Sequence, residues 1–229
     1  MTHSMADRIA AATFAATIAA LLTLPASLSA QDATPALSAA MAQGQAAAIA
    51  KARADSARYP YTTADVNFMA GMIHHHAQAI VMAKMAPTHG ASPSVRTLSE
   101  RIINAQQDEI TLMQRWLRDR NQVVPEATAG PMKMSMGGME HDMVMPGMLT
   151  DAQMKALDEA RGPTFDRLLL TGMIQHHRGA VTMVADLFNT FGAAQDELTF
   201  KFASDAQVDQ TTEIARMQKL LFMLELEAH

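Results

Sequence analysis

The chain carries one short pattern twice. Residues 71–82 read GMIHHHAQAIVM, and residues 172–183 read GMIQHHRGAVTM. A second pair of segments follows in the same order, since QQDEITLMQRWL at 106–117 resembles QTTEIARMQKLL at 210–221. Two motifs repeated in one order predict two copies of one structural unit.

Start and stop signals suggest that each copy is a helical hairpin. Thr62 with Asp65 fits a capping box at the start of a long helix that ends near residues 87–90. A second helix is expected from Ser92 to about residue 121. In the second half, Thr150 opens a short helix that is followed by long helices at about 164–191 and 195–227.

No convincing alternating strand pattern stands out, so the predicted fold class is all-α. Each hairpin has an apolar stripe that it cannot bury alone. We therefore predict an up-down four-helix bundle at residues 60–227. Its parts are repeat one (60–122), a methionine-rich irregular connection (123–149) and repeat two (150–227).

The N-terminal residues predict export. An uncharged apolar stretch follows Arg8, and Pro25 and small residues come next, so residues 1–30 resemble a signal peptide cleaved after about residue 29 or 30. The alternative is an uncleaved anchor, but a membrane span needs about 20 apolar residues. Residues 31–59 are alanine-rich and predict a linker or a loose helix. The predicted location is the periplasm or the exterior, without stable membrane insertion after cleavage.

Composition narrows the chemistry. The net charge is -5 and only 5% of residues are aromatic, which argues against nucleic acid as a partner. The chain has no cysteine but 20 methionines. A soft-metal site would therefore use thioether sulfur and imidazole nitrogen.

Helical spacing puts both histidines of each pair on the inward face. On a wheel of about 100° per residue, the pair straddles the apolar stripe, whereas His74 points away. The alternative is ordinary core packing with methionine as filler. Adjacent buried imidazoles in two paired helices, however, need partners for their nitrogens. We therefore predict a metal site with these ligands: Met72, His75, His76, Met82, Met173, His176, His177 and Met183.

The partner helices contribute further side chains to the same interior. Gln106 and Gln210 fall within the inward arc. So do two glutamates and two methionines, which we expect to support the metal ligands, for example by orienting a histidine: Glu109, Met113, Glu213 and Met217. For the glutamates, pairing with an arginine is the alternative.

The connection between the repeats is a second candidate site. It has seven methionines between residues 132 and 148, in a segment rich in glycine and proline. Exposed thioethers invite oxidation, and core packing does not explain them in such a segment. Copper(I) prefers thioether and imidazole ligands, and the alternative is a low-complexity tether. The candidate ligands are Met132, Met134, Met136, Met139, His141, Met143, Met145 and Met148.

These motifs carry a family resemblance. The paired MIxHHxxA(V/I)xM segments, the EIxxMxxxL partners and the intervening MPGMLTDAQM resemble the DUF305 family over about residues 60–227. That family includes periplasmic copper-binding proteins of the CopM type. The resemblance implies a ferritin-like bundle, export, and copper handling through histidine and methionine.

The residues and the resemblance together predict a copper-binding protein for sequestration, tolerance or delivery, and not an enzyme. Copper(I) is the favoured ion, with copper(II) or silver(I) as alternatives. The competing hypothesis is a ferritin-like di-metal redox enzyme, although Glu109 and Glu213 are too few carboxylates for iron. A homo-oligomer or a copper-transfer partner stays open. Because neutral imidazole is the ligand form, we expect affinity to fall below about pH 6.

Overall fold

The computed structural model describes residues 30–58, 61–136 and 139–227. The predicted signal peptide, residues 1–30, therefore lies outside the described residues except for its last position. The alanine-rich segment forms helix α1 (Ala30–Arg58), whose apolar residues show no one-sided pattern. Within the described ranges, none of the helices combines the length and apolarity that a membrane crossing requires.

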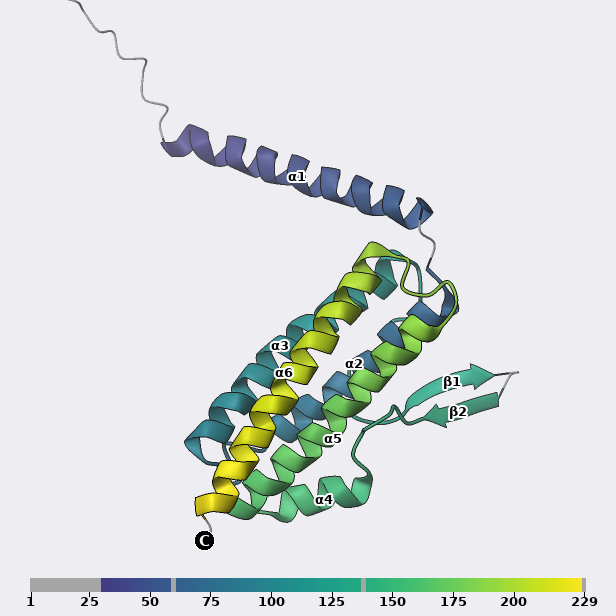
Figure 1. The fold of residues 1–229 in the computed structure, drawn as a ribbon. Helices are drawn as coiled ribbons and strands as arrows, with labels where there is room; N and C mark the ends of the chain where they lie inside the picture. Colours follow the sequence, from purple (N-terminus) through teal and green to yellow (C-terminus); the bar gives the residue numbers. More distant parts are fainter. Residues whose placement is uncertain (1–29, 59–60, 137–138, 228–229) are drawn as a thin grey trace, which may run out of the picture. The chain divides into compact units, whose positions relative to one another are not determined.

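The chain is mostly helical after residue 60, as predicted (Figure 1). The long helices are α2 (Thr63–Lys84), α3 (Pro93–Asp119), α5 (Gly162–Asn189) and α6 (Glu197–Glu227). Short helix α4 (Asp151–Glu159) precedes α5. We call α2, α3, α5 and α6 the helical core.

Local capping sets where three of these helices begin. The backbone N–H of Thr62 donates to the Asp65 carboxylate at 2.7 Å, and the backbone N–H of Asp65 donates to the Thr62 hydroxyl at 3.4 Å. Thr150 and Gln153 form the same reciprocal pair at α4. The Ser92 hydroxyl caps α3, and Pro93 occupies its first turn. These starts agree with the sequence-based predictions.

Each repeat forms a pair of neighbouring helices. Helix α2 packs along α3 and α5 packs along α6, while α2 against α5 is the larger contact between the repeats (Figure 1). The two histidine-bearing helices are therefore neighbours. This arrangement brings the two copies of the repeated motif together.

The helical core has two apolar clusters with polar residues between them. One cluster includes Phe68, Trp116 and Val184, and the other includes Leu98 and Phe165. Each of the four helices contributes one stretch to the first cluster and another stretch to the second. Buried polar side chains lie between these two stretches. We call these side chains the polar layer: His75, His76, Gln106, His176, His177 and Gln210.

The connection between the repeats is not wholly irregular, so this part of the prediction is wrong. Strands β1 (Met132–Met136) and β2 (Met139–Met143) pair as an antiparallel hairpin (Figure 1). In MKMSM and MEHDM, methionine or histidine alternates with a polar residue. This period of two is typical of a β-strand. Sequence analysis missed it because methionine and charged residues are not typical strand formers.

Candidate metal centre

The structure brings the predicted inward residues of both motifs into the helical core. His75, His76, His176 and His177 are each 0% exposed. Of the four predicted methionine ligands on these helices, Met72, Met82 and Met173 are also fully buried. Met183 is half-buried. His74 faces away from this interior, and its Nδ1 lies 3.0 Å from the carbonyl oxygen of Thr128. Thr128 belongs to the connection between the repeats (residues 123–149), which we call the linker.

One histidine of each pair contacts a glutamate of the neighbouring helix. His76 Nε2 lies 2.6 Å from Glu109 Oε2, and His177 Nε2 lies 2.7 Å from Glu213 Oε2. An ionised carboxylate only accepts hydrogen bonds, so each imidazole donates from Nε2. Each glutamate therefore orients a ring and fixes which nitrogen carries the proton.

The other histidine of each pair donates to a backbone carbonyl. His75 Nε2 lies 3.0 Å from the Pro146 oxygen, and His176 Nε2 lies 2.8 Å from the backbone oxygen of His75. The rings of His75 and His176 are neighbours, with centroids 3.7 Å apart. Since a carbonyl oxygen only accepts, both of these rings also carry their proton on Nε2.

All four imidazoles leave the same atom without a partner. In His75, His76, His176 and His177, the Nδ1 atom is buried and makes no hydrogen bond. With Nε2 protonated, each Nδ1 presents a lone pair. Buried polar atoms are usually satisfied, so four unpartnered lone pairs in one layer need partners, which a bound ion or ordered water supplies. Neutral imidazole is the side chain that most often binds metal ions in proteins.

Burial keeps two of these rings neutral. Burial lowers the pKa of His75 to about 3, with a further contribution from His76. Burial also holds the pKa of His176 well below its usual value, and the neighbouring histidines add to this effect. Because these two residues are already neutral near pH 6, protonation of His75 or His176 would not cause the expected loss of affinity below about pH 6, and that loss stays a prediction for the other ligands.

Methionines lie on both sides of the polar layer in matching sets. Met72, Met113 and the half-buried Met183 belong to or pack on one apolar cluster. The repeat-related residues Met173, Met217 and Met82 belong to the other. Among the described residues, no group of three or more histidines and carboxylates is placed to hold a metal ion. The donors that this interior combines are imidazole nitrogen and thioether sulfur, and that combination suits a soft ion.

The structure divides the predicted ligands of the linker. Met132, Met145 and Met148 are 6%, 4% and 7% exposed and pack as one cluster against Met183. Met143 is 41% exposed. The other candidates, whose side chains lie outside the described part, occupy backbone register positions in the hairpin: Met134 opposite His141, and Met136 opposite Met139.

Two residues that sequence analysis did not select attach the linker to the helices. Gln78 of α2 binds Leu149 twice, donating to its carbonyl at 3.0 Å and accepting from its N–H at 2.7 Å. At the equivalent position of α5, Gly179 lets the backbone of Pro146 and Gly147 approach closely. In the sequence, these two residues could have been found because the repeats differ at this position, with Gln78 in one and Gly179 in the other.

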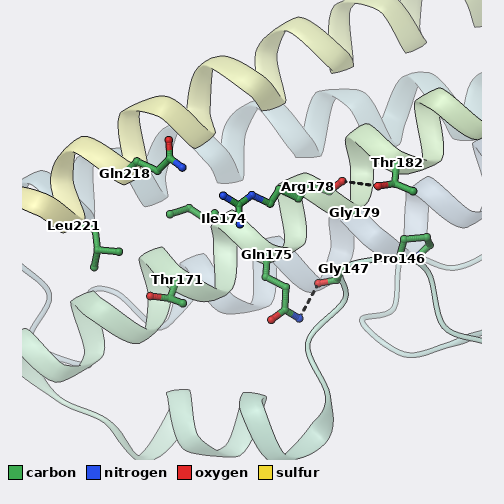
Figure 2. A pocket seen from close by; sticks show the side chains of 10 residues that line it. All are labelled: Pro146, Gly147, Thr171, Ile174, Gln175, Arg178, Gly179, Thr182, Gln218 and Leu221. Atoms are coloured by element: carbon green, nitrogen blue, oxygen red, sulfur yellow. Dashed lines mark hydrogen bonds between the residues drawn. The ribbon is translucent and has the colours of Figure 1, made fainter.

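A surface cavity of about 650 Å³ lies beside this attachment (Figure 2). Gln175 reaches toward the linker there and donates to the Gly147 carbonyl at 3.3 Å. Neither imidazole nor thioether groups line this cavity, so it is distinct from the candidate metal centre. Its lining residues are Pro146, Gly147, Thr171, Ile174, Gln175, Arg178, Gly179, Thr182, Gln218 and Leu221.

Comparisons with known proteins identify the family of the chain. The model of the domain of unknown function DUF305 matches residues 65–221. No curated protein matches. Among solved structures, a DUF305 fragment from Deinococcus radiodurans is 25% identical, with a TM-score of 0.59, over 72% of this chain and 99% of its own. A DUF305 protein from Streptomyces coelicolor, named as a secreted protein, is 28% identical over 71% and 92%, with a TM-score of 0.60.

A third similar structure is CopM in its Cu(II)-bound form. It is 30% identical over 69% of this chain and 95% of its own, with a TM-score of 0.51. CopM in its Cu(I)-bound form matches at 28% identity over 68% and 94%, also with a TM-score of 0.51.

Proposed function

Because the chain belongs to the DUF305 family, we propose that it is an exported copper-binding protein that sequesters, detoxifies or delivers the metal through histidine and methionine. In this proposal the helical core is an up-down bundle of ferritin-like type, and copper(I) is the preferred ion. The protein acts by binding copper and not as an enzyme.

The observation that carries the proposal is the set of four buried, unpartnered Nδ1 atoms. Each sits on a ring whose Nε2 donates to a carboxylate or a carbonyl oxygen. Such hydrogen bonds commonly orient metal-binding histidines. A soft ion would meet both ligand types in this interior, since methionines flank the polar layer on both sides.

The relatives support copper as the ion and export as the route. CopM has been solved with copper bound in two oxidation states, and the Streptomyces relative is named as secreted. Copper(I) is favoured here because thioethers are soft and uncharged. The proposal also includes assembly as a homo-oligomer or transfer of copper to a partner protein.

The di-metal enzyme alternative has weaker support. A ferritin-like di-metal centre uses carboxylates from several helices. Here Glu109 and Glu213 each bind a histidine, and positions 72 and 73, three before His75 and His76, hold Met and Ile. These contacts suit a role in orienting imidazole better than a role in bridging two hard cations.

The test is a titration of the purified chain with Cu(I) in the presence of a competing chelator. We expect tight binding, and a fall in affinity of more than about 100-fold in the double variant His75→Gln and His176→Gln, because losing a group that only orients a ligand already costs about 10- to 100-fold. The matched control is His74→Gln, because repeat two already has glutamine at the equivalent position, 175. Weak binding by the unaltered chain, or equal affinities for all three proteins, would overturn the proposal.

A further inference from the structure

The linker breaks the symmetry between the two repeats at one pair of glycines. A Cβ atom on Gly71 would lie 3.2 Å from Met145 Sδ and 3.6 Å from Met183 Cε. On the repeat-related Gly172, it would lie 3.0 Å from Leu149 Cδ2 and 3.1 Å from Met82 Cε. Met183 and Met82 are themselves repeat-related. The linker therefore supplies a thioether on one side and an aliphatic group on the other.

On the Gly71 side, the linker adds further thioethers. Met132, Met145 and Met148 form a buried cluster with Met183 and Ala70 packed against it. We call the four methionines the thioether cluster. They come from three separate segments: the start of β1, the segment after β2, and helix α5. Apolar packing alone does not require sulfur here, because a leucine occupies the equivalent place on the Gly172 side.

The backbone that carries Met145 and Met148 is anchored at several points. His75 Nε2 lies 3.0 Å from the Pro146 oxygen, and Gln78 makes two hydrogen bonds to Leu149. Gly147 adopts φ +76° where the chain passes close to Gly179. Anchoring on both sides of Gly147 holds these methionines in place before any ligand arrives, which lowers the entropic cost of binding.

The β-hairpin has further methionine and histidine positions in register beyond Met132. In its register, Met132 lies opposite Met143, Met134 opposite His141, and Met136 opposite Met139. These three pairs alternate with Lys133 opposite Asp142 and Ser135 opposite Glu140, so they occupy positions on one face of the ribbon. Met132 belongs to both the hairpin and the cluster.

We propose that the thioether cluster is a second site, separate from the polar layer, that binds one soft monovalent ion with Met132, Met145, Met148 and Met183 as its ligands. This inference rests on the proposed function only in naming copper(I) as that ion. Thioethers are neutral and carry no proton near pH 7, so binding here displaces no proton and changes no oxidation state. Hard cations find no oxygen ligand among these four side chains.

The test compares two double variants of the full chain, titrated with Cu(I) under a competing chelator. The double variant Met145→Leu with Met148→Leu keeps the side-chain volume nearly the same and removes two sulfur atoms. Leucine is the residue that already packs against the equivalent glycine, Gly172, on the opposite side. We expect it to lose one equivalent of copper, with fewer sulfur neighbours in X-ray absorption. The control, Met85→Leu with Met154→Leu, removes two methionines outside the cluster and should keep that equivalent. Unfolding midpoints check that all proteins fold.

The outcomes separate this inference from the proposed function. If His75→Gln with His176→Gln loses copper while the Met145 and Met148 variant keeps every equivalent, the thioether site is wrong and the proposed function stands. If each double variant loses a different equivalent, both are supported. If the unaltered chain binds no Cu(I), both fail.

Discussion

The polar layer and the thioether cluster are adjacent, but they hold their side chains in different ways. In the polar layer, a hydrogen bond to a glutamate or a carbonyl fixes the orientation of each imidazole. In the thioether cluster, apolar packing and an anchored backbone hold the sulfurs. Protons and charge should therefore affect the first region, whereas shape and sulfur content should affect the second.

The largest expected effect on stability comes from a substitution at the contact between the linker and helix α5. A Cβ atom on Gly179 would lie 1.9 Å from the Pro146 carbonyl oxygen, and that neighbour is backbone. Gly179→Ala should therefore displace the linker or lower the free energy of unfolding by about 3 kcal/mol. Denaturant unfolding measures the change.

The control for this variant is Gly44→Ala in α1, where an added Cβ meets open space. Alanine suits a helix better than glycine, so this control should be neutral or stabilising by up to about 1 kcal/mol. If Gly179→Ala behaves like the control, the linker is not held against α5 as described.

The next effect concerns pH and should involve the polar layer and not the thioether cluster. Burial lowers the pKa of His75 from 6.5 to about 3. Between these pH values the unfolded chain binds more protons, so the stability from neutral His75 is complete above pH 6.5 and falls as pH falls. From pH 7 to pH 5 the loss is about 2 kcal/mol for this residue, and His176 acts in the same direction.

Urea unfolding of the metal-free chain at pH 7, 6 and 5 measures this slope. The variant with glutamine at positions 75 and 176 should show a shallower slope, since these two groups no longer titrate. The variant with leucine at positions 145 and 148 should keep the slope of the unaltered chain. Stability that does not change from pH 7 to pH 5 would contradict the assignment of neutral, buried imidazoles.

A smaller effect is expected from the glutamates. Glu109→Gln and Glu213→Gln keep the shape but remove the charge that supports His76 and His177. Each should weaken Cu(I) binding about tenfold, or about 1.4 kcal/mol. Only the equivalent bound by the polar layer should change. Exposed Glu100→Gln on the same helix α3 is the matched control, and an equal effect from it would remove the specific role of the two glutamates.

The smallest effect belongs to the outer end of the linker. Met143 is 41% exposed, so Met143→Ser should change the free energy of unfolding by less than about 0.5 kcal/mol. The number of copper equivalents should stay the same, since Met143 lies outside the thioether cluster. A lost equivalent in the chelator titration would show that the hairpin itself holds an ion.

Sequence reasoning worked where local rules decide the structure. The capping residues Thr62, Ser92 and Thr150 set helix starts through contacts within one turn. The helical period also separated His74 from His75 and His76. Such features depend on helical geometry and on side chains within one turn, which is why they are visible without coordinates.

Features that depend on distant contacts were out of reach. The helical wheel assigned Met183 to the helical site, but the folded linker brings Met132 and Met145 to it. The low pKa of His75 follows from burial and from its neighbours, and the amino-acid type gives only the ordinary value. The β-hairpin was missed because its alternation uses methionine instead of β-branched residues.

A crystal structure of the copper-loaded chain, with anomalous scattering at the copper edge, tests the central claim most directly. The account predicts a copper ion bonded to Nδ1 of at least one of the histidines 75, 76, 176 and 177 in the polar layer, with Nε2 still on its carbonyl or glutamate partner. Copper bonded only to linker methionines, with all four Nδ1 atoms still unpartnered, would contradict it.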